Sequence, residues 1–339
     1  MQFGLIGAGR WGQNYLRVLT SLDGVKVKYC CDNNPSRLAA LSKDYPQVSF
    51  TTNWQEVAND PEIEAVVIAT PPASHFPLVM AALQRGKNVL VEKPCAVKLT
   101  DIQQLFQAAE EKNKVLMVGH VMEYNSALQW VKNYLHDGKI GNLLYAYFSR
   151  SNLGIVRQDV NILWDLAIHE LAMLRFLLEK EPQSISAQGG CYLQPGIHDV
   201  VFINLKFPGN VMAQIHASWL ESAKTRKATL IGDRQTVVFD DVQNQDKIWV
   251  FDRGMTSFYE PIEAGAGNYQ FVPRYGDIHL PAVQLQEPLL KQCQHFFECI
   301  KSGAEPITGK TDALWVTKVA ELAQQSLDSH GAPILVSLA

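Results

Sequence analysis

The stretch GLIGAGRWG, at residues 4–12, constrains the possible folds of this chain more than any other. It directly follows an apolar, strand-like segment and opens a run whose apolar residues have near-helical spacing. Within it, Gly7, Gly9 and Gly12 fit the pattern G-x-G-x-x-G. Between a strand and a helix, the first such glycine permits a tight turn, the second admits a pyrophosphate, and the third lets the helix approach the strand. The pattern therefore predicts a dinucleotide site or, as the alternative, a tight turn without a ligand.

Asp32 favours the dinucleotide site over the simple turn. It ends the next strand-like run, about 20 residues after Gly12, where an acidic side chain accepts hydrogen bonds from the adenosine ribose. Arg10 and Trp11, inside the glycine stretch, are then expected to lie beside the cofactor. The carboxylate would repel a 2′-phosphate, which favours NAD over NADP, although Arg37 is close enough along the chain to bind such a phosphate.

The pattern of apolar residues in the sequence changes near residue 120. Up to there, short apolar β-branched runs alternate with amphipathic helical stretches, which predicts a parallel sheet flanked by helices. Beyond it, longer strand-like runs joined by short turns predict an antiparallel or mixed sheet with a helix at residues 163–178. The Gly- and Pro-rich residues 253–286 are expected to form a long surface loop, followed by helices at 287–301 and 310–329.

These elements divide the chain into two domains. Its 339 residues exceed the roughly 250–300 residues at which single cores stop growing. We predict an α/β protein with a Rossmann domain at residues 1–120. An α+β domain for substrate binding and oligomerisation is predicted at residues 121–309. The last helix, near residues 310–330, is expected to pack back on the first domain.

Charge and cysteine content exclude several classes of function. The net charge is −4 and no block of Lys or Arg is present, so neither nucleic acid nor an anionic membrane is an expected partner. The six cysteines form no CxxC pair and no zinc-ligand spacing, which predicts reduced thiols and no metal site. The sequence has no run of roughly 18 apolar residues. The first strand-like run begins at residue 2, so we expect no signal peptide before the fold and therefore a cytoplasmic protein.

Two motifs follow the next strand-like runs: TPPASH at residues 70–75 and VEKP at residues 91–94. Together they resemble motifs of the Gfo/Idh/MocA family of sugar and polyol oxidoreductases, and the resemblance extends through WDLAIHE to EPLLKQCQHFFECIKSG near the end of the chain. It implies a nicotinamide-binding Rossmann domain followed by a domain with a large open-faced mixed or antiparallel sheet, and a cis bond between Lys93 and Pro94. The cofactor contacts expected from these motifs are Thr70, Pro71, His75, Glu92 and Lys93.

Within the family, SRSNLGIVRQDVNILWDLAIHE resembles the cleft segment of the nucleotide-sugar and amino-sugar 3-dehydrogenase branch. One departure concerns the segment in which many relatives have an Arg-Tyr-Asn-Pro-like stretch. This chain has MEYNSA there, with Glu123 and Ser126. Substrate contacts that relatives make through this segment therefore do not transfer directly.

Substrate contacts are expected from Tyr124, Asn152 and Arg157. Arginines such as Arg150 and Arg157, which flank the cleft segment, can form forked hydrogen bonds to a phosphate or carboxylate of the substrate. The alternative is that both arginines lie at a solvated strand end.

Oxidation of a secondary alcohol needs a hydride acceptor and a base for the hydroxyl proton, and a nicotinamide supplies only the first. Lys93 is expected at the carboxyl end of a strand, where open α/β sheets bind ligands, and burial can lower the pKa of a lysine toward neutrality. Asp165 and His169 are four apart on a helical pattern, so the carboxylate can orient the imidazole and raise its basicity. We predict that all three are catalytic, with either Lys93 or His169 as the proton acceptor. The alternatives are a lysine in solvent and a histidine within a helix core.

The sequence therefore predicts an NAD(P)-dependent dehydrogenase or reductase that acts on a secondary hydroxyl of a sugar, polyol or nucleotide-linked sugar. Two alternatives remain: a glycosidase that uses tightly held NAD for transient oxidation, and a non-catalytic sensor of nicotinamide levels. The presence of Lys93, Asp165 and His169 argues against the sensor. An open-faced sheet needs covering, so we expect a homodimer or homotetramer.

Overall fold

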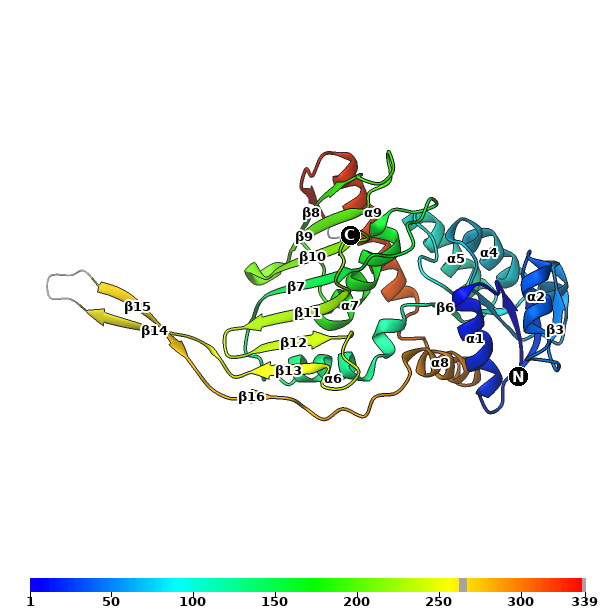
Figure 1. Cartoon of the computed structure of the whole chain (residues 1–339), viewed down its shortest axis with the longest axis horizontal. Coiled ribbons are helices and arrows are strands. Elements are labelled where there is room, and N and C mark those ends of the chain that lie inside the picture. The colour runs from blue at the N-terminus through cyan, green and yellow to red at the C-terminus, as the bar shows by residue number, and fades with distance from the viewer. Residues whose placement is uncertain (262–266, 337–339) are drawn as a thin grey trace. The chain divides into compact units, whose positions relative to one another are not determined.

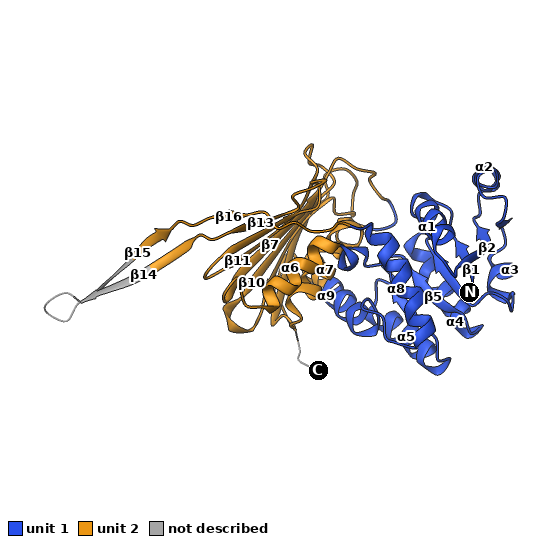
Figure 2. Ribbon diagram, turned by 90° about the horizontal axis from the view of Figure 1, so that it is seen from below, with its two compact units in different colours: residues 1–125, 158–160, 286–321 blue, residues 126–157, 161–285, 322–339 orange. Residues whose placement is uncertain are grey.

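The computed structural model describes residues 1–261 and 267–336. It contains two compact units, each built from more than one stretch of the chain (Figure 2). Unit 1 comprises Met1–Asn125, Gln158–Val160 and Gln286–Glu321, and unit 2 comprises Ser126–Arg157, Asn161–Leu285 and Leu322–Ala339.

Unit 1 contains a six-stranded parallel sheet with the strand order β3-β2-β1-β4-β5-β6. This order, which runs outward in both directions from β1 and β4, is that of a Rossmann fold. All residues of β4 and β5 are buried, as expected for parallel strands covered on both faces by helices. The strands are β1 (Gln2–Ile6), β2 (Lys26–Cys31), β3 (Ser49–Thr51), β4 (Ala65–Ile68), β5 (Asn88–Val91) and β6 (Leu116–Val118).

Helices cover both faces of this sheet. Consecutive residues of β4 alternate between two core clusters: Ala65 and Val67 belong to one, and Val66 and Ile68 to the other. The first cluster includes apolar residues of α1 and α8, and the second includes apolar residues of α4 and α5. The helices and short 3-10 turns of unit 1 are α1 (Arg10–Ser21), α2 (Pro35–Leu41), α3 (Trp54–Asn59), η1 (Pro72–Ser74), α4 (His75–Gln84), α5 (Leu99–Glu111), η2 (Val121–Tyr124) and α8 (Pro288–Ser302).

Helix α8 belongs to unit 1 although it follows most of unit 2 in the sequence. Its Phe296 packs edge-on against Phe3 of β1, with 5.9 Å between the ring centroids. The second domain predicted from the sequence, residues 121–309, includes this helix and therefore differs from unit 2. The contacts of α8 join the two ends of the chain, so no local sequence pattern indicates them. Helix α9 (Lys310–Asp328) begins in unit 1 and ends in unit 2.

Unit 2 contains a nine-stranded sheet with the order β16-β13-β12-β11-β7-β10-β9-β8-β17. The sheet is mixed, because β10 pairs with β7 in parallel while the other pairs are antiparallel. The predicted fold class, a Rossmann domain followed by a domain with a large mixed sheet, is confirmed. The strands are β7 (Leu143–Ser151), β8 (Ser184–Gly190), β9 (Val200–Lys206), β10 (Met212–Ser218), β11 (Thr225–Gly232), β12 (Thr236–Asp240), β13 (Ile248–Phe251), β16 (Ile278–His279) and β17 (Ile334–Leu335).

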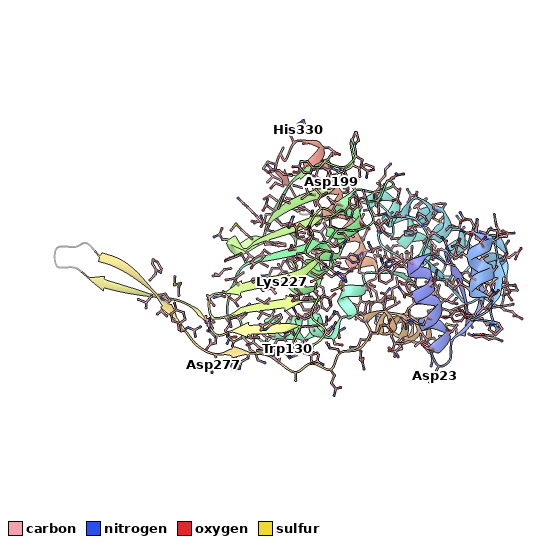
Figure 3. The ribbon with its side chains drawn as sticks, viewed as in Figure 1. Asp23, Trp130, Asp199, Lys227, Asp277 and His330 are labelled. Carbon is pink, nitrogen blue, oxygen red and sulfur yellow. The ribbon has the colours of Figure 1, made fainter. Side chains whose placement is uncertain are left out.

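The two faces of the nine-stranded sheet differ in burial. Helices α6 (Ser126–His136) and α7 (Ile168–Leu178) lie against one face (Figure 2). On β9, Val201, Ile203 and Leu205 are buried, whereas the residues between them point to the other face and are exposed. This second face also bears Lys227 of β11, labelled in Figure 3, which is opposite Ser149 in the strand register. The pattern agrees with the open-faced sheet expected from the family resemblance.

Part of the predicted surface loop at residues 253–286 forms a β-hairpin. Strands β14 (Gly254–Pro261) and β15 (Gly267–Arg274) pair antiparallel and project from the large sheet of unit 2 (Figure 1). The prediction of a long surface loop is wrong for these strands. Their β-branched and aromatic residues, such as Thr256, Phe271 and Val272, favour strands although Gly and Pro are frequent nearby. Within the described residues, no helix is both long and apolar enough to cross a membrane.

Candidate functional site

The glycine loop lies between β1 and α1, and each of its three glycines has a different environment. Gly7 has a φ of 97°, in the region that residues with side chains rarely adopt. A Cβ at Gly12 would lie 1.9 Å from the carbonyl oxygen of Gly7, whereas a Cβ at Gly9 would meet no atom within 4 Å. The loop therefore leaves open space at the N-terminus of α1, where the helix dipole favours phosphate. Arg10 and Trp11, the first residues of α1, are exposed.

Asp32 follows the end of β2 and fixes the glycine loop. Its Oδ2 accepts a hydrogen bond from the backbone N–H of Ala8 over 2.7 Å, and its Oδ1 accepts one from the N–H of Asn34 over 2.9 Å. Nη1 of Arg37 donates to the same carboxylate, with distances of 3.0 and 2.9 Å to the two oxygens. Arg37, the predicted partner of a 2′-phosphate, thus forms an ion pair with Asp32, the residue expected to repel that phosphate. The sequence places both residues near this site but does not indicate their ion pair.

Lys93 lies two residues after β5, in a turn with a cis bond between Lys93 and Pro94. The cis bond implied by the family resemblance is therefore present. The side chain of Lys93 is half-buried. Its backbone N–H donates to Oε2 of Glu92 over 3.2 Å.

Glu92 is buried, and its carboxylate bonds to a side chain of helix α1. Its Oε1 accepts a hydrogen bond from the hydroxyl of Tyr15 over 2.8 Å. Burial raises the pKa of Glu92, and the charge of Lys93 and the bond from Tyr15 act in the opposite direction. The predicted contact of Glu92 with the cofactor stays a prediction. Sequence reasoning missed Tyr15, which lies 77 residues away in the chain.

His75 begins helix α4 and is fully buried. Its Nδ1 lies 2.7 Å from the carbonyl oxygen of Pro94, and its Nε2 lies 2.8 Å from the carbonyl oxygen of Thr70. The ring therefore bridges the loop after β4 and the turn that carries Lys93. The cofactor contacts predicted for His75, Thr70 and Pro71 stay predictions.

Four of these segments share one edge of the sheet. The glycine loop, Asp32, the Thr70 loop and the Lys93 turn follow the carboxyl ends of β1, β2, β4 and β5, which are parallel neighbours. Open α/β sheets bind ligands at this edge, near the point where the strand order reverses. The residues predicted for the cofactor are therefore brought together in unit 1.

Tyr124 lies in the core of unit 1. Its ring is 2% exposed, and its hydroxyl shares a 3.1 Å hydrogen bond with Oγ1 of Thr308. Burial raises the pKa of Tyr124 well above its usual range. The 3-10 turn η2 directs the ring inward against His295 of α8. The substrate contact predicted for Tyr124 stays a prediction.

Two buried residues close to Tyr124 in the sequence, His120 and Glu123, lie beside the buried Asp312. Nδ1 of His120 bonds to Oδ2 of Asp312 over 2.6 Å, and Oε1 of Glu123 lies 4.0 Å from the same nitrogen. These three side chains could bind a metal ion, a grouping that sequence reasoning missed because Asp312 is 192 residues from His120. The hydrogen bond itself connects the end of β6 with the start of α9.

In unit 2, a five-residue π-helical turn, η3 (Leu163–Ala167), precedes α7 and carries Asp165. Such turns occur often at functional sites. The indole N–H of the buried Trp219 donates to Oδ2 of Asp165 over 3.1 Å, and Nη1 of Arg157 lies 3.6 Å from Oδ1. His169, in the first turn of α7, is 9% exposed. Orientation of His169 by Asp165 stays a prediction, whereas the bond from Trp219 to Asp165 was missed by sequence reasoning.

The arginines near the cleft segment have different roles. Arg157 is partly exposed beside Asp165, and the half-buried Asn152 directly follows β7. Arg150 is 4% exposed, and its Nε bonds to both carboxylate oxygens of Glu170 at 2.7 Å. This buried ion pair disagrees with both expectations for Arg150, which were substrate binding and a solvated strand end.

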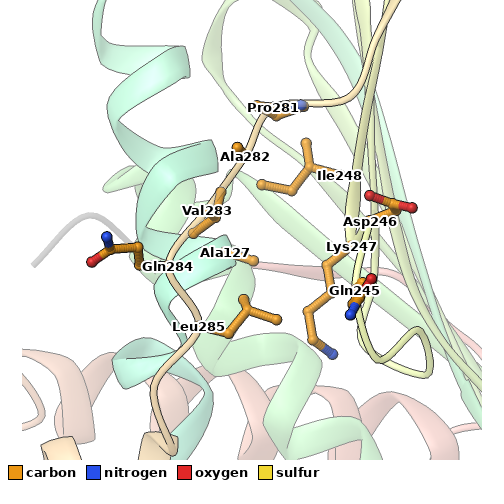
Figure 4. A pocket seen from close by; sticks show the side chains of 10 residues that line it. All are labelled: Ala127, Gln245, Asp246, Lys247, Ile248, Pro281, Ala282, Val283, Gln284 and Leu285. Carbon is orange, nitrogen blue, oxygen red and sulfur yellow. The ribbon is translucent and has the colours of Figure 1, made fainter.

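Unit 2 also contains a pocket of about 410 Å³ (Figure 4). It lies beside the chain segment before α8 and the turn between β12 and β13. Its lysine, Lys247, is already paired with Asp241, with 3.1 Å between Nζ and Oδ1. None of the residues predicted for catalysis or binding lines it. The lining residues are Ala127, Gln245, Asp246, Lys247, Ile248, Pro281, Ala282, Val283, Gln284 and Leu285.

Two protein-family models match the chain in succession. Residues 1–120 match an oxidoreductase family model with an NAD-binding Rossmann fold, and residues 128–238 match the model of the GFO/IDH/MocA C-terminal domain. The chain belongs to the Gfo/Idh/MocA family. The predicted family, enzyme class and NAD cofactor are thereby confirmed.

Oxidoreductases of known sequence or structure resemble the chain at low identity. An uncharacterized oxidoreductase of Streptococcus pneumoniae is 27% identical over 223 residues, which are 61% of this chain and 59% of the relative. The scyllo-inositol 2-dehydrogenase (NAD(+)) of Bacillus subtilis is 23% identical over 97% of this chain and 94% of its own length. The crystal structure of an oxidoreductase from Agrobacterium radiobacter in complex with NAD+, L-tartaric acid and magnesium matches with a TM-score of 0.81 at 22% identity. The match covers 99% of this chain and 98% of the Agrobacterium chain.

The residues of unit 1 fit the NAD that the Gfo/Idh/MocA fold implies. The open position at Gly9 and the N-terminus of α1 suit the pyrophosphate, and the carboxylate of Asp32 suits the ribose hydroxyls. The half-buried Lys93 follows a neighbouring strand at the same edge of the sheet.

Proposed function

We propose that this protein is an NAD-dependent dehydrogenase that oxidises a secondary hydroxyl of a sugar, polyol or nucleotide-linked sugar. The observation that carries the proposal is the shared sheet edge of unit 1, where the glycine loop, Asp32 and Lys93 follow neighbouring parallel strands. The inositol dehydrogenase of Bacillus subtilis, which acts on a cyclic polyol, supports this class of substrate. The resemblance of residues 149–170 to the nucleotide-sugar branch supports the nucleotide-linked alternative within the class.

In this proposal, unit 1 binds the cofactor through its glycine loop and Asp32. When bound, the nicotinamide supplies the hydride acceptor. Lys93 donates a hydrogen bond to the reacting oxygen and stabilises negative charge as the hydroxyl proton leaves. His169 accepts that proton. Asp165, fixed by the indole of Trp219 and facing Arg157, favours the protonated form of the imidazole.

Discrimination between NAD and NADP is assigned to Asp32. Two backbone N–H groups fix its carboxylate independently of Arg37, so the negative charge stays beside the ribose position. Arg37 is 39% exposed on its side chain and can leave the carboxylate as ribose hydroxyls replace it. The remaining charge of Asp32 disfavours a 2′-phosphate.

We also infer a homo-oligomer that covers the open face of the unit 2 sheet. This face bears exposed aromatic and apolar side chains, including Tyr145, Tyr147, Phe202 and Met212, each more than 40% exposed. Apolar patches of this kind mark interaction sites. Light scattering of the purified protein tests the inference, and replacement of Tyr147 and Phe202 by Lys is expected to yield monomers. The expected cytoplasmic location stays a prediction.

The test of the proposed activity is NADH formation with a panel of inositols, free sugars and nucleotide-linked sugars. The proposal predicts NADH in stoichiometric amount with a ketone product from at least one class. Turnover of a glycoside without net NADH would support the redox-neutral glycosidase instead.

A further inference from the structure

A buried chain of hydrogen bonds in unit 1 connects helix α8 with the turn that carries Lys93. Nε2 of Gln292 donates to the hydroxyl of Tyr15 over 3.2 Å, and this hydroxyl donates to Oε1 of Glu92 over 2.8 Å. Oε2 of Glu92 accepts from the backbone N–H of Lys93 over 3.2 Å. Tyr15 and Gln292 are fully buried and Glu92 is 7% exposed. Because water does not compete at such positions, each of these bonds is stronger than it would be in solvent.

Two hydrogen-bond donors lie against the carboxyl group of Glu92. The hydroxyl of Tyr15 and the peptide of Lys93 each donate a hydrogen to one of its oxygens. An ionised carboxylate is only an acceptor, whereas a protonated carboxyl group has an O–H that needs an acceptor of its own. Nε2 of Gln292 lies 3.2 Å from the same phenol oxygen. An ionised carboxylate can accept from both donors, so the arrangement suits a carboxylate.

The groups that face Glu92 act in opposite directions on its ionisation. Burial raises the pKa of Glu92, whereas the positive charge of Lys93, the bond from Tyr15 and the nearby His120 lower it. Cys293 of α8 also faces Glu92, and burial raises the pKa of this thiol, so it remains neutral. Burial and the adjacent carboxylate raise the pKa of Tyr15 well above its usual range, so its hydroxyl retains the hydrogen that it donates.

We propose that Tyr15, supported by Gln292, is a positioning residue that holds Glu92 as a fixed carboxylate behind Lys93. A negative charge next to Lys93 favours its ammonium form, which can donate to a substrate oxygen. The bond from the Lys93 peptide to the same carboxylate fixes the turn. The proposal rests on the role of Lys93 in the proposed function, and it names the residues that set the charge and position of that lysine.

The experiment compares Tyr15→Phe with Tyr124→Phe as a matched control. Both variants remove one hydroxyl from a buried tyrosine of unit 1, but the hydroxyl of Tyr124 bonds to Thr308 instead of Glu92. The pH titration of the Glu92 carboxyl carbon is followed by NMR of ¹³C-glutamate-labelled protein, with the resonance assigned through Glu92→Gln. Loss of a bond to a charged group is expected to raise the proton affinity of Glu92 by about tenfold or more in Tyr15→Phe. It should not change in Tyr124→Phe.

Gln292→Met gives an independent test if Tyr15→Phe is poorly folded. This substitution removes the N–H that polarises the Tyr15 hydroxyl but retains the apolar volume. The expected change has the same direction and is smaller, about threefold in proton affinity. Melting temperatures and NADH binding of all variants show whether the fold is retained. An unchanged titration of Glu92 in both folded Tyr15→Phe and Gln292→Met would overturn the proposal.

Turnover distinguishes positioning from a purely structural role. In Tyr15→Phe, kcat is expected to fall near neutral pH and to recover at higher pH, where Glu92 becomes ionised again; Tyr124→Phe should show no such recovery. A uniform loss at every pH would contradict the proposal. If Lys93→Ala retains the wild-type rate, the proposed function fails, whereas the NMR titration still decides whether Tyr15 controls Glu92.

Discussion

The two units differ in how the sequence specifies their functional side chains. In unit 1, short motifs place Gly7, Asp32 and Lys93 directly after strands of one parallel sheet, so strand order alone brings them to one edge. In unit 2, Asp165 is held by Trp219, which is 54 residues away in the chain. The comparison shows that a site residue can be predicted from sequence when the backbone of a local motif positions it. It cannot be predicted in this way when side chains that are distant in the sequence hold it.

Lys93→Ala tests unit 1, in which short motifs specify the site, and it has the largest expected effect on kcat. It removes a positive charge beside the developing alkoxide together with an orienting hydrogen bond, so kcat should fall by about 10²–10³-fold or more. NADH binding, measured by fluorescence, should remain because the glycine loop and Asp32 are unchanged. A wild-type kcat in this variant would remove Lys93 from the mechanism.

Glu170→Ala tests the importance of distant contacts in unit 2 through stability. It leaves Arg150 without its buried partner, next to Arg226 in the strand register. Removal of one member of a buried ion pair typically costs about 3–5 kcal/mol in the free energy of unfolding. The double variant Arg150→Met/Glu170→Leu should be much less destabilised in urea unfolding. Equal destabilisation of the single and double variants would show that packing, and not charge, dominates at this position.

Asp32→Ala sharpens the assignment of cofactor specificity in unit 1. The substitution removes the bonds to the ribose and the repulsion toward a 2′-phosphate, so NAD should bind about 10–100-fold more weakly. NADP binding should weaken less. Isothermal titration of both cofactors checks this, and Arg37→Ala provides the control for the adjacent cation. A wild-type protein that prefers NADP would contradict the role given to Asp32.

Trp219→Phe has the smallest expected effect and tests whether a distant side chain supports catalysis in unit 2. It removes the indole donor from Asp165, and kcat should fall by roughly threefold to tenfold. Trp164→Phe is the matched control, because Trp164 is a buried tryptophan on the same π-helical turn as Asp165. If the kcat of Trp219→Phe equals that of Trp164→Phe, the bond from Trp219 is not needed for turnover.

Much of the fold and part of the site could be predicted from the sequence. Alternation of strand and helix patterns indicated the Rossmann domain, and the glycine spacing, Asp32 and VEKP indicated its functional edge. The hairpin β14–β15 was missed because its Gly and Pro content resembles that of a loop. The buried positions of Glu92 and Tyr124 depend on Tyr15 and Thr308, at separations of 77 and 184 residues. Local patterns contain no information about such contacts.

The pH dependence of kcat for wild type, His169→Ala and Lys93→Met tests the proposed proton transfer most directly. With a substrate identified from the sugar panel, the wild-type rate should rise with pH through the ionisation of the base. His169→Ala should lower kcat by about 10²–10⁴-fold and lose this rise, although Lys93 is still present. The account is contradicted if the rise persists in His169→Ala and disappears in Lys93→Met, because Lys93 would then be the base.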